Sequence, residues 1–364
     1  MMKSVSSAYI HIPFCENICS YCDFCKMYYD KKWINKYLKS LKNEIIKNYK
    51  GEVLKTIYIG GGTPSSLALN ELKELFNILN ILKKDKNIEY TIEVNPENIT
   101  KEKLLLMKKN GVNRISIGVE TTNDYLLKKL NRKHNFIDIK EKINLMKQLE
   151  FDNINVDLIY ALPEQTIDDI KIDLDRLTSL PITHISLYSL MINDHTKFGI
   201  ENIKSIDEDV DYEMYQFICK YLQEKDFIHY EISNFSRKDY QSQHNLVYWH
   251  NEMYYGFGLG ASGYLNNIRY ENTKSISKYL EDKFRYNEEK LTIKDVITYE
   301  LILGFRLIDG INKQDFYQKY HQELINLYNI KDLIKEKKLI DNGSNIKVSY
   351  DKIYIENEIL INFL

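Results

Sequence analysis

Six short runs of β-forming residues recur along the first half of the chain. Each is followed by a polar stretch with the apolar spacing of an amphipathic helix, such as 33–49 and 70–84. Alternating strands and helices are typical of βα units around a parallel sheet. The spacing predicts an α/β fold, a partial (β/α)6 barrel of the TIM type, with an open doubly wound sheet as the alternative. The runs lie at 8–12, 56–60, 90–94, 114–119, 154–160 and 184–190.

Chemically distinctive residues gather late in these strands or directly after them. Barrel enzymes carry their chemistry on the loops at the carboxyl ends of the strands. This placement therefore favours the barrel over the open sheet. The residues are Cys15, Cys19 and Cys22 after the first strand, GGGTP (60–64) after the second, and Glu93, Glu120, Asp157 and Tyr188 in the remaining four.

The βα pattern ends near residue 205. A helix-like stretch at 207–225 and an aromatic, glycine-rich run at 244–264 follow it. From about residue 275 the chain is charged and mostly helical, and it ends in β-like pieces at 345–349 and 353–361. We predict a barrel at 1–205, a barrel extension at 206–272, and a small, mainly helical, winged-helix-like C-terminal domain at 273–364.

Charge and hydropathy disfavour several classes of partner. Lys and Arg (50) nearly balance Asp and Glu (52), so the net charge of −2 gives no general attraction for nucleic acid. No apolar window is long enough to span a bilayer, and the N-terminal residues lack the apolar core of a signal peptide. We expect a cytosolic protein without membrane insertion, in which cysteines stay reduced.

The stretch CENICSYCDFC (15–25) holds four of the five cysteines. Reducing conditions disfavour disulfides. A structural zinc site usually joins two separated ligand pairs, whereas these four cysteines share one loop and Cys219 lies far away. A [4Fe-4S] cluster takes one thiolate per iron corner and suits a short loop better. Three ligands would leave one iron open for a substrate or cofactor, while a four-thiolate zinc knot stays the alternative.

The spacing Cys15-x3-Cys19-x2-Cys22, with an aromatic residue before the last cysteine, resembles the radical S-adenosyl-L-methionine (SAM) superfamily. The resemblance implies that these three cysteines hold a [4Fe-4S] cluster whose open iron binds SAM. One electron then splits SAM to methionine and a 5′-deoxyadenosyl radical, while the protein orients the cofactor. Cys25 is surplus, either an incidental thiol or a residue with a redox role.

Further motifs narrow the resemblance to oxygen-independent coproporphyrinogen III oxidases and HemW-type heme chaperones. They are YIHIPFCENICSYCDF, GGGTPS, IEVNPE, RISIGVE, LNRKH, VDLIYALPEQT and YEISNF. Without the resemblance, GGGTP would indicate a tight turn, Glu93 and Asp157 would be solvated acids at strand ends, and Arg132 would be a cation at a helix end. The family usually has Gln at position 120, so Glu120 replaces a donor by an acceptor there. Carried over by position, the resemblance implies a SAM site of Tyr9, Gly61, Gly62, Thr63, Glu93, Glu120, Arg132 and Asp157.

Two features favour the chaperone branch. The oxidases have a longer segment before the first cysteine and a fourth cysteine two positions after the third. This chain has Phe24 at that position, and Cys25 comes one residue later. The chaperones carry an H-N-x-x-Y-W motif, and this chain reads HNLVYW at 244–249.

The resemblance implies that His244 is a heme ligand and that Asn245, Tyr248 and Trp249 shape the site. Imidazole is a good axial ligand for heme iron, and aromatic rings can cover a porphyrin face. His250 is a rival ligand, and a hydrogen-bonded core histidine is the structural alternative. The following GFGLGASGY imitates a dinucleotide fingerprint but lacks its strand–turn–helix context, so we expect a close-packed turn instead.

We therefore predict a radical SAM protein that binds heme and delivers it to an acceptor protein, with a membrane-bound respiratory enzyme as a candidate acceptor. The cofactors are a [4Fe-4S] cluster, SAM and heme. The alternative is an oxygen-independent coproporphyrinogen III oxidase of porphyrin biosynthesis. Whether the SAM machinery catalyses a reaction stays open, and a homodimer is compatible with the resemblance.

Overall fold

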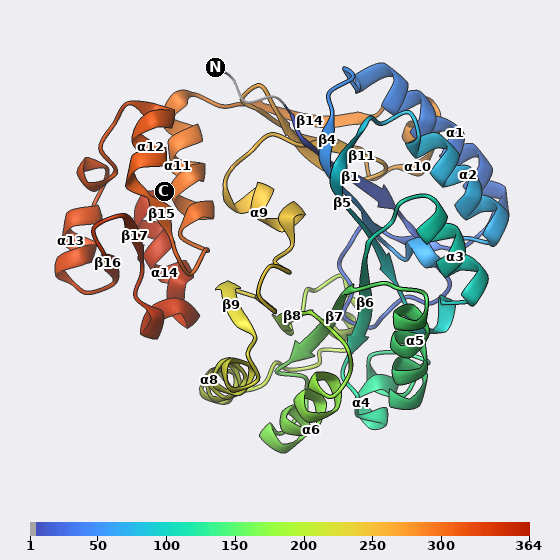
Figure 1. Ribbon diagram of the computed structural model, residues 1–364, viewed down its shortest axis with the longest axis horizontal. Coiled ribbons are helices and arrows are strands. Elements are labelled where there is room, and N and C mark those ends of the chain that lie inside the picture. The colour runs from blue at the N-terminus through green and yellow to red at the C-terminus, as the bar shows by residue number, and fades with distance from the viewer. Residues whose placement is uncertain (1–4) are drawn as a thin grey trace.

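Six parallel strands form the wall of a partial barrel in the computed structural model, which describes residues 5–364 (Figure 1). Each strand pairs with the next one along the chain. A doubly wound sheet would reverse its order at a switch point, so the predicted barrel is confirmed and the open-sheet alternative is wrong. The strands are β1 (Ser7–Ile12), β4 (Leu54–Gly61), β5 (Lys84–Val94), β6 (Arg114–Glu120), β7 (Asn153–Tyr160) and β8 (His184–Ser189).

Both ends of this wall carry extra strands. Strand β11 (Tyr255–Phe257) pairs in parallel with β1 at one edge. At the other edge, β10 (Asn234–Ser236) pairs antiparallel with β8, and β9 (Ile228–Glu231) pairs with β10. Between these segments runs helix α9 (Gln243–Trp249), which packs against β4. The barrel is therefore partial, and α9 lies at its open side (Figure 1).

Helices cover the outer face of the sheet (Figure 1). Alternate strand residues point to opposite faces, so Ile57 and Ile59 of β4 enter the core while Tyr58 faces the barrel interior. The predicted helix at 70–84 stops at Leu79, because Asn80 caps it and β5 already begins at Lys84. The covering helices are α1 (Lys31–Asn48), α2 (Leu69–Leu79), α3 (Lys101–Lys109), α5 (Phe136–Gln148), α6 (Ile167–Thr178) and α8 (Glu208–Glu224).

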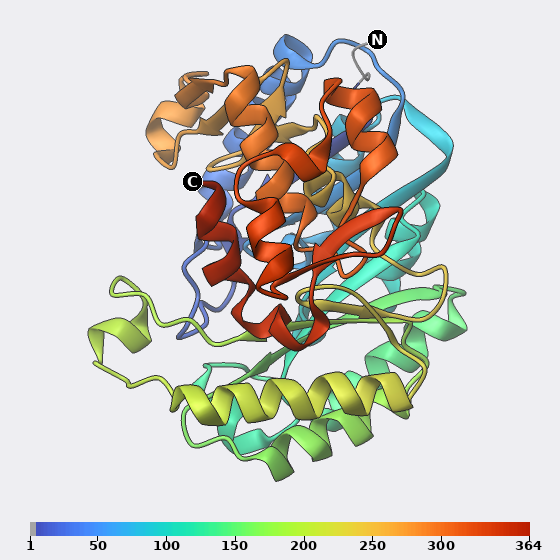
Figure 2. The same ribbon diagram turned by 90° about the vertical axis from the view of Figure 1, so that its left-hand side faces the viewer.

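The C-terminal part is mostly helical and lies in front of the barrel in Figure 2. The β-like prediction for 353–361 is wrong, because this stretch forms a 3-10 turn (Tyr350–Ile355) and helix α14 (Glu356–Leu360). The apolar residues of this stretch are buried at positions that fit the period of a helix as well as that of a strand. The other helices are α11 (Ile293–Gly304), α12 (Lys313–Tyr320) and α13 (Ile330–Lys335), and a small sheet joins β15 (Ile311–Asn312), β17 (Asn345–Val348) and β16 (Leu339–Asp341).

A three-stranded antiparallel sheet precedes these helices, and helix α10 (Ile276–Leu280) lies within it in sequence. Its strands are β12 (Ser262–Leu265), β13 (Ile268–Asn272) and β14 (Arg285–Lys290). The sequence analysis did not anticipate β13 and β14. The division into three parts remains a prediction. No helix among residues 5–364 has both the length and the apolarity needed to cross a membrane.

Candidate functional site

The cysteine loop is clamped over the carboxyl ends of the strands. Strands β2 (Phe14–Cys15) and β3 (Met27–Tyr28) pair in parallel and close the loop at its base. Two backbone hydrogen bonds hold its middle: the Ser20 N–H donates to the Leu130 carbonyl (3.1 Å), and the Phe198 N–H donates to the Ser20 carbonyl (3.0 Å). The cysteines therefore sit at the barrel mouth, as predicted from their place after the first strand.

Cys15, Cys19 and Cys22 line one pocket at this mouth, with a volume of about 340 Å³. Burial raises the pKa of Cys15 to about 11, and a metal bound to the sulfur would favour its thiolate. The Thr63 hydroxyl donates to the Cys15 sulfur (3.5 Å), which suits a metal-bound thiolate. The three thiols thus fit a cluster that takes one thiolate per iron. A four-thiolate zinc knot would need Cys25 as its fourth ligand, and Cys25 does not line this pocket.

Cys25 is kept apart from the other three cysteines. It does not line the pocket. A methyl group on Gly260 would lie 2.8 Å from its sulfur, and its carbonyl accepts a hydrogen bond from His11 Nε2 (2.7 Å). The neighbouring Phe24 does line the pocket and is 65% exposed. The geometry therefore separates a group of three thiols from a fourth that packs elsewhere.

The glycines after β4 allow the backbone to approach the cysteines closely. Gly61 has φ +118°, and a Cβ there would lie 2.6 Å from the His11 ring. A Cβ on Gly62 would lie 2.9 Å from the Cys15 sulfur. Only glycine both adopts such a positive φ easily and leaves out the Cβ for which there is no space. This turn therefore presents backbone without side chains to the pocket.

Two carboxylates face the pocket from strands β5 and β7, which lie on either side of β6. Glu93 accepts hydrogen bonds from the Tyr58 hydroxyl (2.8 Å) and the Gly61 N–H (3.0 Å). Burial, with a smaller effect from the charge of Asp157, raises the pKa of Glu93 to about 7. Asp157 accepts from the Ser116 hydroxyl (3.1 Å), and burial also raises its pKa. Both carboxylates can accept hydrogen bonds from a ligand or balance a cation.

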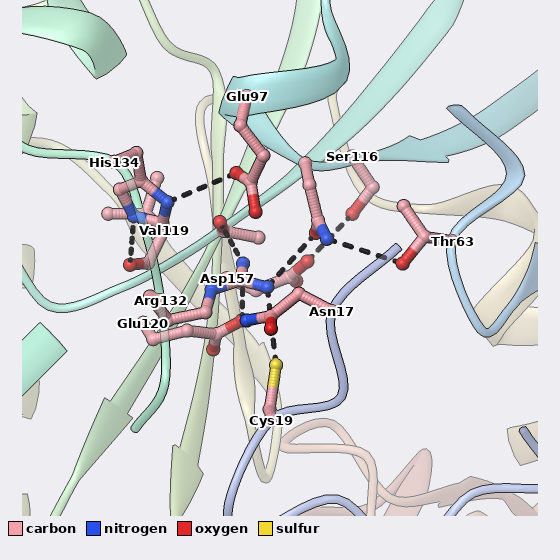
Figure 3. A network of polar contacts seen from close by, with 12 residues as sticks. Asn17, Cys19, Thr63, Glu97, Ser116, Val119, Glu120, Arg132, His134 and Asp157 are labelled. Atoms are coloured by element: carbon pink, nitrogen blue, oxygen red, sulfur yellow. Dashed lines mark hydrogen bonds and ion pairs between the residues drawn. The ribbon is translucent and has the colours of Figure 1, made fainter. Parts of the chain in front are cut away.

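Arg132 forms the centre of a polar network at the pocket wall (Figure 3). Its guanidinium lies 3.1 Å from Glu120 and donates to Asn95 (3.1 Å), to the Gly118 carbonyl and to the Cys19 sulfur (3.5 Å). Burial opposes the charge of Arg132, but Cys19 and Glu120 more than offset it and raise its pKa. A ligand carboxylate would have to compete with these partners. Glu120 thus serves as a counterion for Arg132, which the sequence analysis did not foresee.

All the residues predicted for the cluster and for SAM line this pocket, except Tyr9. The Tyr9 hydroxyl bonds with His11 Nδ1 (2.9 Å), and its ring stacks on Tyr58 at 6.2 Å. Sequence reasoning missed Tyr58, Asn95 and Ser116, which also line the pocket. Strand periodicity was the available signal, because Asn95 lies two residues after Glu93, on the same face.

The four specified residues of HNLVYW lie on helix α9, and His244 is buried there, with only 1% of its surface exposed. Its Nδ1 bonds with the Thr56 hydroxyl (2.7 Å), and its Nε2 bonds with the Tyr248 hydroxyl (2.8 Å). Burial lowers the pKa of His244 to about 3, so the ring is neutral. Trp249 lies 5.9 Å from the Arg306 guanidinium. His244 is therefore a buried, hydrogen-bonded histidine in this structure, while Asn245, Tyr248 and Trp249 are partly exposed. Heme ligation by the motif stays a prediction.

The glycine-rich run after α9 lacks the context of a dinucleotide site. Strand β12 follows it where the fingerprint requires a helix. Gly258 has φ +105°, and its N–H donates to the buried Glu44 (2.8 Å). The run is a close-packed turn, as predicted.

Comparisons with known proteins agree with this geometry. The model of the radical SAM superfamily matches residues 9–177. The heme chaperone HemW of Lactococcus lactis subsp. lactis (strain IL1403) is 39% identical, and the match covers 100% of this chain and 98% of the relative. The heme chaperone HemW of Bacillus subtilis (strain 168) is 37% identical, with 99% of each chain covered.

A solved structure has the same fold. Coproporphyrinogen III oxidase (HemN) from Escherichia coli superposes with a TM-score of 0.87 at 21% identity. The match covers 100% of this chain and 90% of the oxidase. At this identity the likeness establishes the fold alone.

Proposed function

The chain belongs to the HemW family of the radical SAM superfamily, and we propose that it is a heme chaperone, which binds heme and delivers it to an acceptor protein. The observation that carries this proposal is similarity over the full length of named heme chaperones, at 39% and 37% identity. The HNLVYW motif at 244–249 supports the same branch, and so does Phe24, which stands two positions after Cys22, where the oxidases have their fourth cysteine.

At the barrel mouth, we propose that Cys15, Cys19 and Cys22 hold a [4Fe-4S] cluster. When bound, the cluster and SAM supply one-electron chemistry. The protein would orient the cluster and SAM and balance their charges. Thr63 and Arg132 donate hydrogen bonds toward cysteine sulfurs, which stabilises them as thiolates.

The other pocket residues would hold SAM. Glu93 and Asp157, as carboxylates, would accept hydrogen bonds from ribose hydroxyls or balance the sulfonium charge. Gly61 and Gly62 would bring backbone to the amino-acid end of SAM, and Thr63, Glu120 and Arg132 would complete the wall. Tyr9 would act from behind through Tyr58, on which it stacks.

For heme, we propose His244 as the iron ligand, with Asn245, Tyr248 and Trp249 around it. A neutral imidazole is the form that binds iron, and burial holds His244 in that form. We place the chaperone in the cytosol, with a heme protein such as a membrane-bound respiratory enzyme as the acceptor. A homodimer is part of the proposal.

The test is a paired measurement on anaerobically purified protein with a reconstituted cluster. Hemin titration followed at the Soret band should give saturable, stoichiometric binding, and coproporphyrinogen III with SAM and a reductant should not be converted. His244→Ala should abolish the binding, while the matched variant His250→Ala should retain it. Efficient conversion without heme binding would reject the chaperone and favour the oxidase.

A further inference from the structure

The imidazole of His244 has no nitrogen available to a metal in this structure. Thr56 occupies Nδ1 and Tyr248 occupies Nε2. The ring of Tyr58 stacks on the imidazole at 5.2 Å, and the ring of Tyr248 meets it edge-on at 5.1 Å. A heme iron needs the lone pair of one nitrogen, so one of these hydrogen bonds must break before iron can bind.

The two hydrogen bonds differ in where they lie. Thr56 belongs to β4, on the barrel wall, and is 3% exposed. Tyr248 is only half-buried and also lines a cavity of about 190 Å³ on the side of α9 that faces the C-terminal part. Tyr248 therefore both holds Nε2 and lines this cavity, whereas Thr56 holds Nδ1 from the barrel wall.

The walls of this cavity suit the edge of a porphyrin. Tyr254 and Leu303 provide apolar surface, and Tyr254 packs edge-on against Tyr248 with ring centroids 4.7 Å apart. Ligand pockets usually hold about 300–1,000 Å³. The cavity thus takes part of a macrocycle, and the space that Tyr248 fills would extend it toward His244.

Arg269 brings a cation to the same cavity. Its guanidinium lies 3.9 Å from the ring centroid of Tyr299 and donates to Asn251 (2.7 Å). Its buried Nε has no hydrogen-bond partner among residues 5–364. Guanidinium groups bind carboxylates through paired hydrogen bonds, and heme carries two propionate carboxylates. Asn251 and Glu252 also line the cavity, and Arg269 is the cation among its lining residues. Apolar surface beside this arginine matches an apolar ring with acidic side chains.

We propose that heme enters through this cavity, that Tyr248 turns away so that Nε2 of His244 binds the iron, and that Arg269 binds a heme propionate. The His244 proton then stays on Nδ1 and is donated to Thr56, and the Nε2 lone pair replaces its hydrogen bond with Tyr248 by a bond to iron. This inference rests on the proposed heme function. Tyr248 acts as a removable cap, and Arg269 as the anchor that fixes the porphyrin in place.

The cap is tested with Tyr248→Phe, which keeps the ring and removes the hydroxyl that competes with iron. Hemin should bind about three- to tenfold more tightly and faster, because one hydrogen bond no longer has to be broken. His244→Ala in the same background should abolish the gain. Equal or weaker binding by Tyr248→Phe, with an unchanged melting temperature, would overturn the cap.

The anchor is tested with Arg269→Gln and two probes, hemin and hemin dimethyl ester, which lacks ionised propionates. Hemin affinity should fall about tenfold in the variant, whereas ester affinity should be the same in both proteins. Arg269→Lys should recover part of the hemin affinity. An equal loss for both probes would overturn the anchor. If the wild-type chain binds no heme at all, the proposed function itself is rejected. If it binds heme with an affinity that substitutions of Tyr248 and Arg269 do not change, only this inference is rejected.

Discussion

The barrel mouth and helix α9 carry the two proposed groups of functional residues, and the two regions differ in how accessible those residues are to a ligand. At the mouth, three thiols line an open pocket, and the surrounding polar groups hold one another in place. At α9, the imidazole of His244 is closed off by two hydrogen bonds and two tyrosine rings. The mouth is organised before any ligand arrives, whereas the proposed heme ligand must first lose one of its two hydrogen bonds.

This difference has an energetic consequence. In a preorganised site, little of the binding free energy is spent on rearranging the protein. In a closed site, binding is weakened by the free energy of the internal hydrogen bonds that must break. A closed site also releases its ligand more readily, because the protein re-forms those bonds. A chaperone must release heme, so a heme site that re-forms its own hydrogen bonds favours transfer. A cluster site that behaved in the same way would favour loss of the cluster.

The largest expected effect tests the mouth. Cys19→Ser removes one of the three proposed cluster ligands, and we expect bound iron and sulfide per chain to fall roughly tenfold or more. Iron analysis and the visible absorption of the reconstituted protein measure it. Cys25→Ser is the matched control and should keep the full cluster, since Cys25 does not line the pocket. Equal losses in both variants would show that four cysteines act together.

Next in size is the buried ion pair that supports the mouth. Arg132→Met leaves the carboxylate of Glu120 buried without its cation, and both residues are 7% exposed. Removing one partner of such a pair destabilises a protein by about 3–5 kcal/mol. Urea denaturation of the apoprotein measures the loss. Adding Glu120→Gln should recover most of it, and a single variant as stable as the wild type would show that the pair does not support the pocket.

The contrast between the two regions also separates what the sequence could predict from what it could not. The strand positions and the pocket residues were predictable because they follow strand order. Cys15, Gly61, Glu93 and Asp157 each come late in a barrel strand or shortly after one, and a parallel barrel brings the carboxyl ends of its strands together. Neither the pairing of Arg132 with a glutamate nor the mispredicted strand at 353–361 follows from such an order.

The sealing of His244 could not be predicted for a related reason. Its partner Thr56 is 188 residues away in the chain, and no local pattern links them. Only the bond with Tyr248 has a local signal, because residues four apart share one face of a helix. A short sequence motif thus identifies its own residues, but it does not predict which distant residues they contact in the folded chain.

A smaller effect tests how tightly α9 is held. Thr56→Val keeps the shape of the side chain but removes the hydroxyl that bonds with Nδ1 of His244 (2.7 Å). A buried polar group without a partner costs about 1–3 kcal/mol. Chemical denaturation should show that loss in the free energy of unfolding. In His244→Ala the same Thr56 substitution should cost much less, and an equal cost in both backgrounds would mean that this hydrogen bond does not hold the imidazole.

The smallest effect is a pH dependence at the mouth. Burial raises the pKa of Glu93 from 4.5 to about 7 in the unliganded protein. Between these values the native chain binds more protons than the unfolded chain, so the free energy of unfolding contributed by Glu93 decreases as pH rises through that window. A SAM cation favours the carboxylate, so SAM binding must first remove this proton at low pH. SAM affinity should therefore be about fourfold weaker at pH 6.5 than at pH 8.

Calorimetric titration with SAM across this range, on the cluster-loaded protein, measures the dependence. Glu93→Gln is the matched control, because it keeps the shape of the side chain and cannot titrate. Any pH dependence left in that variant belongs to SAM itself or to other groups such as Asp157. If the wild type and Glu93→Gln had the same profile, Glu93 would not be the proton-linked contact, and the mouth would be ready for SAM at every pH in the range.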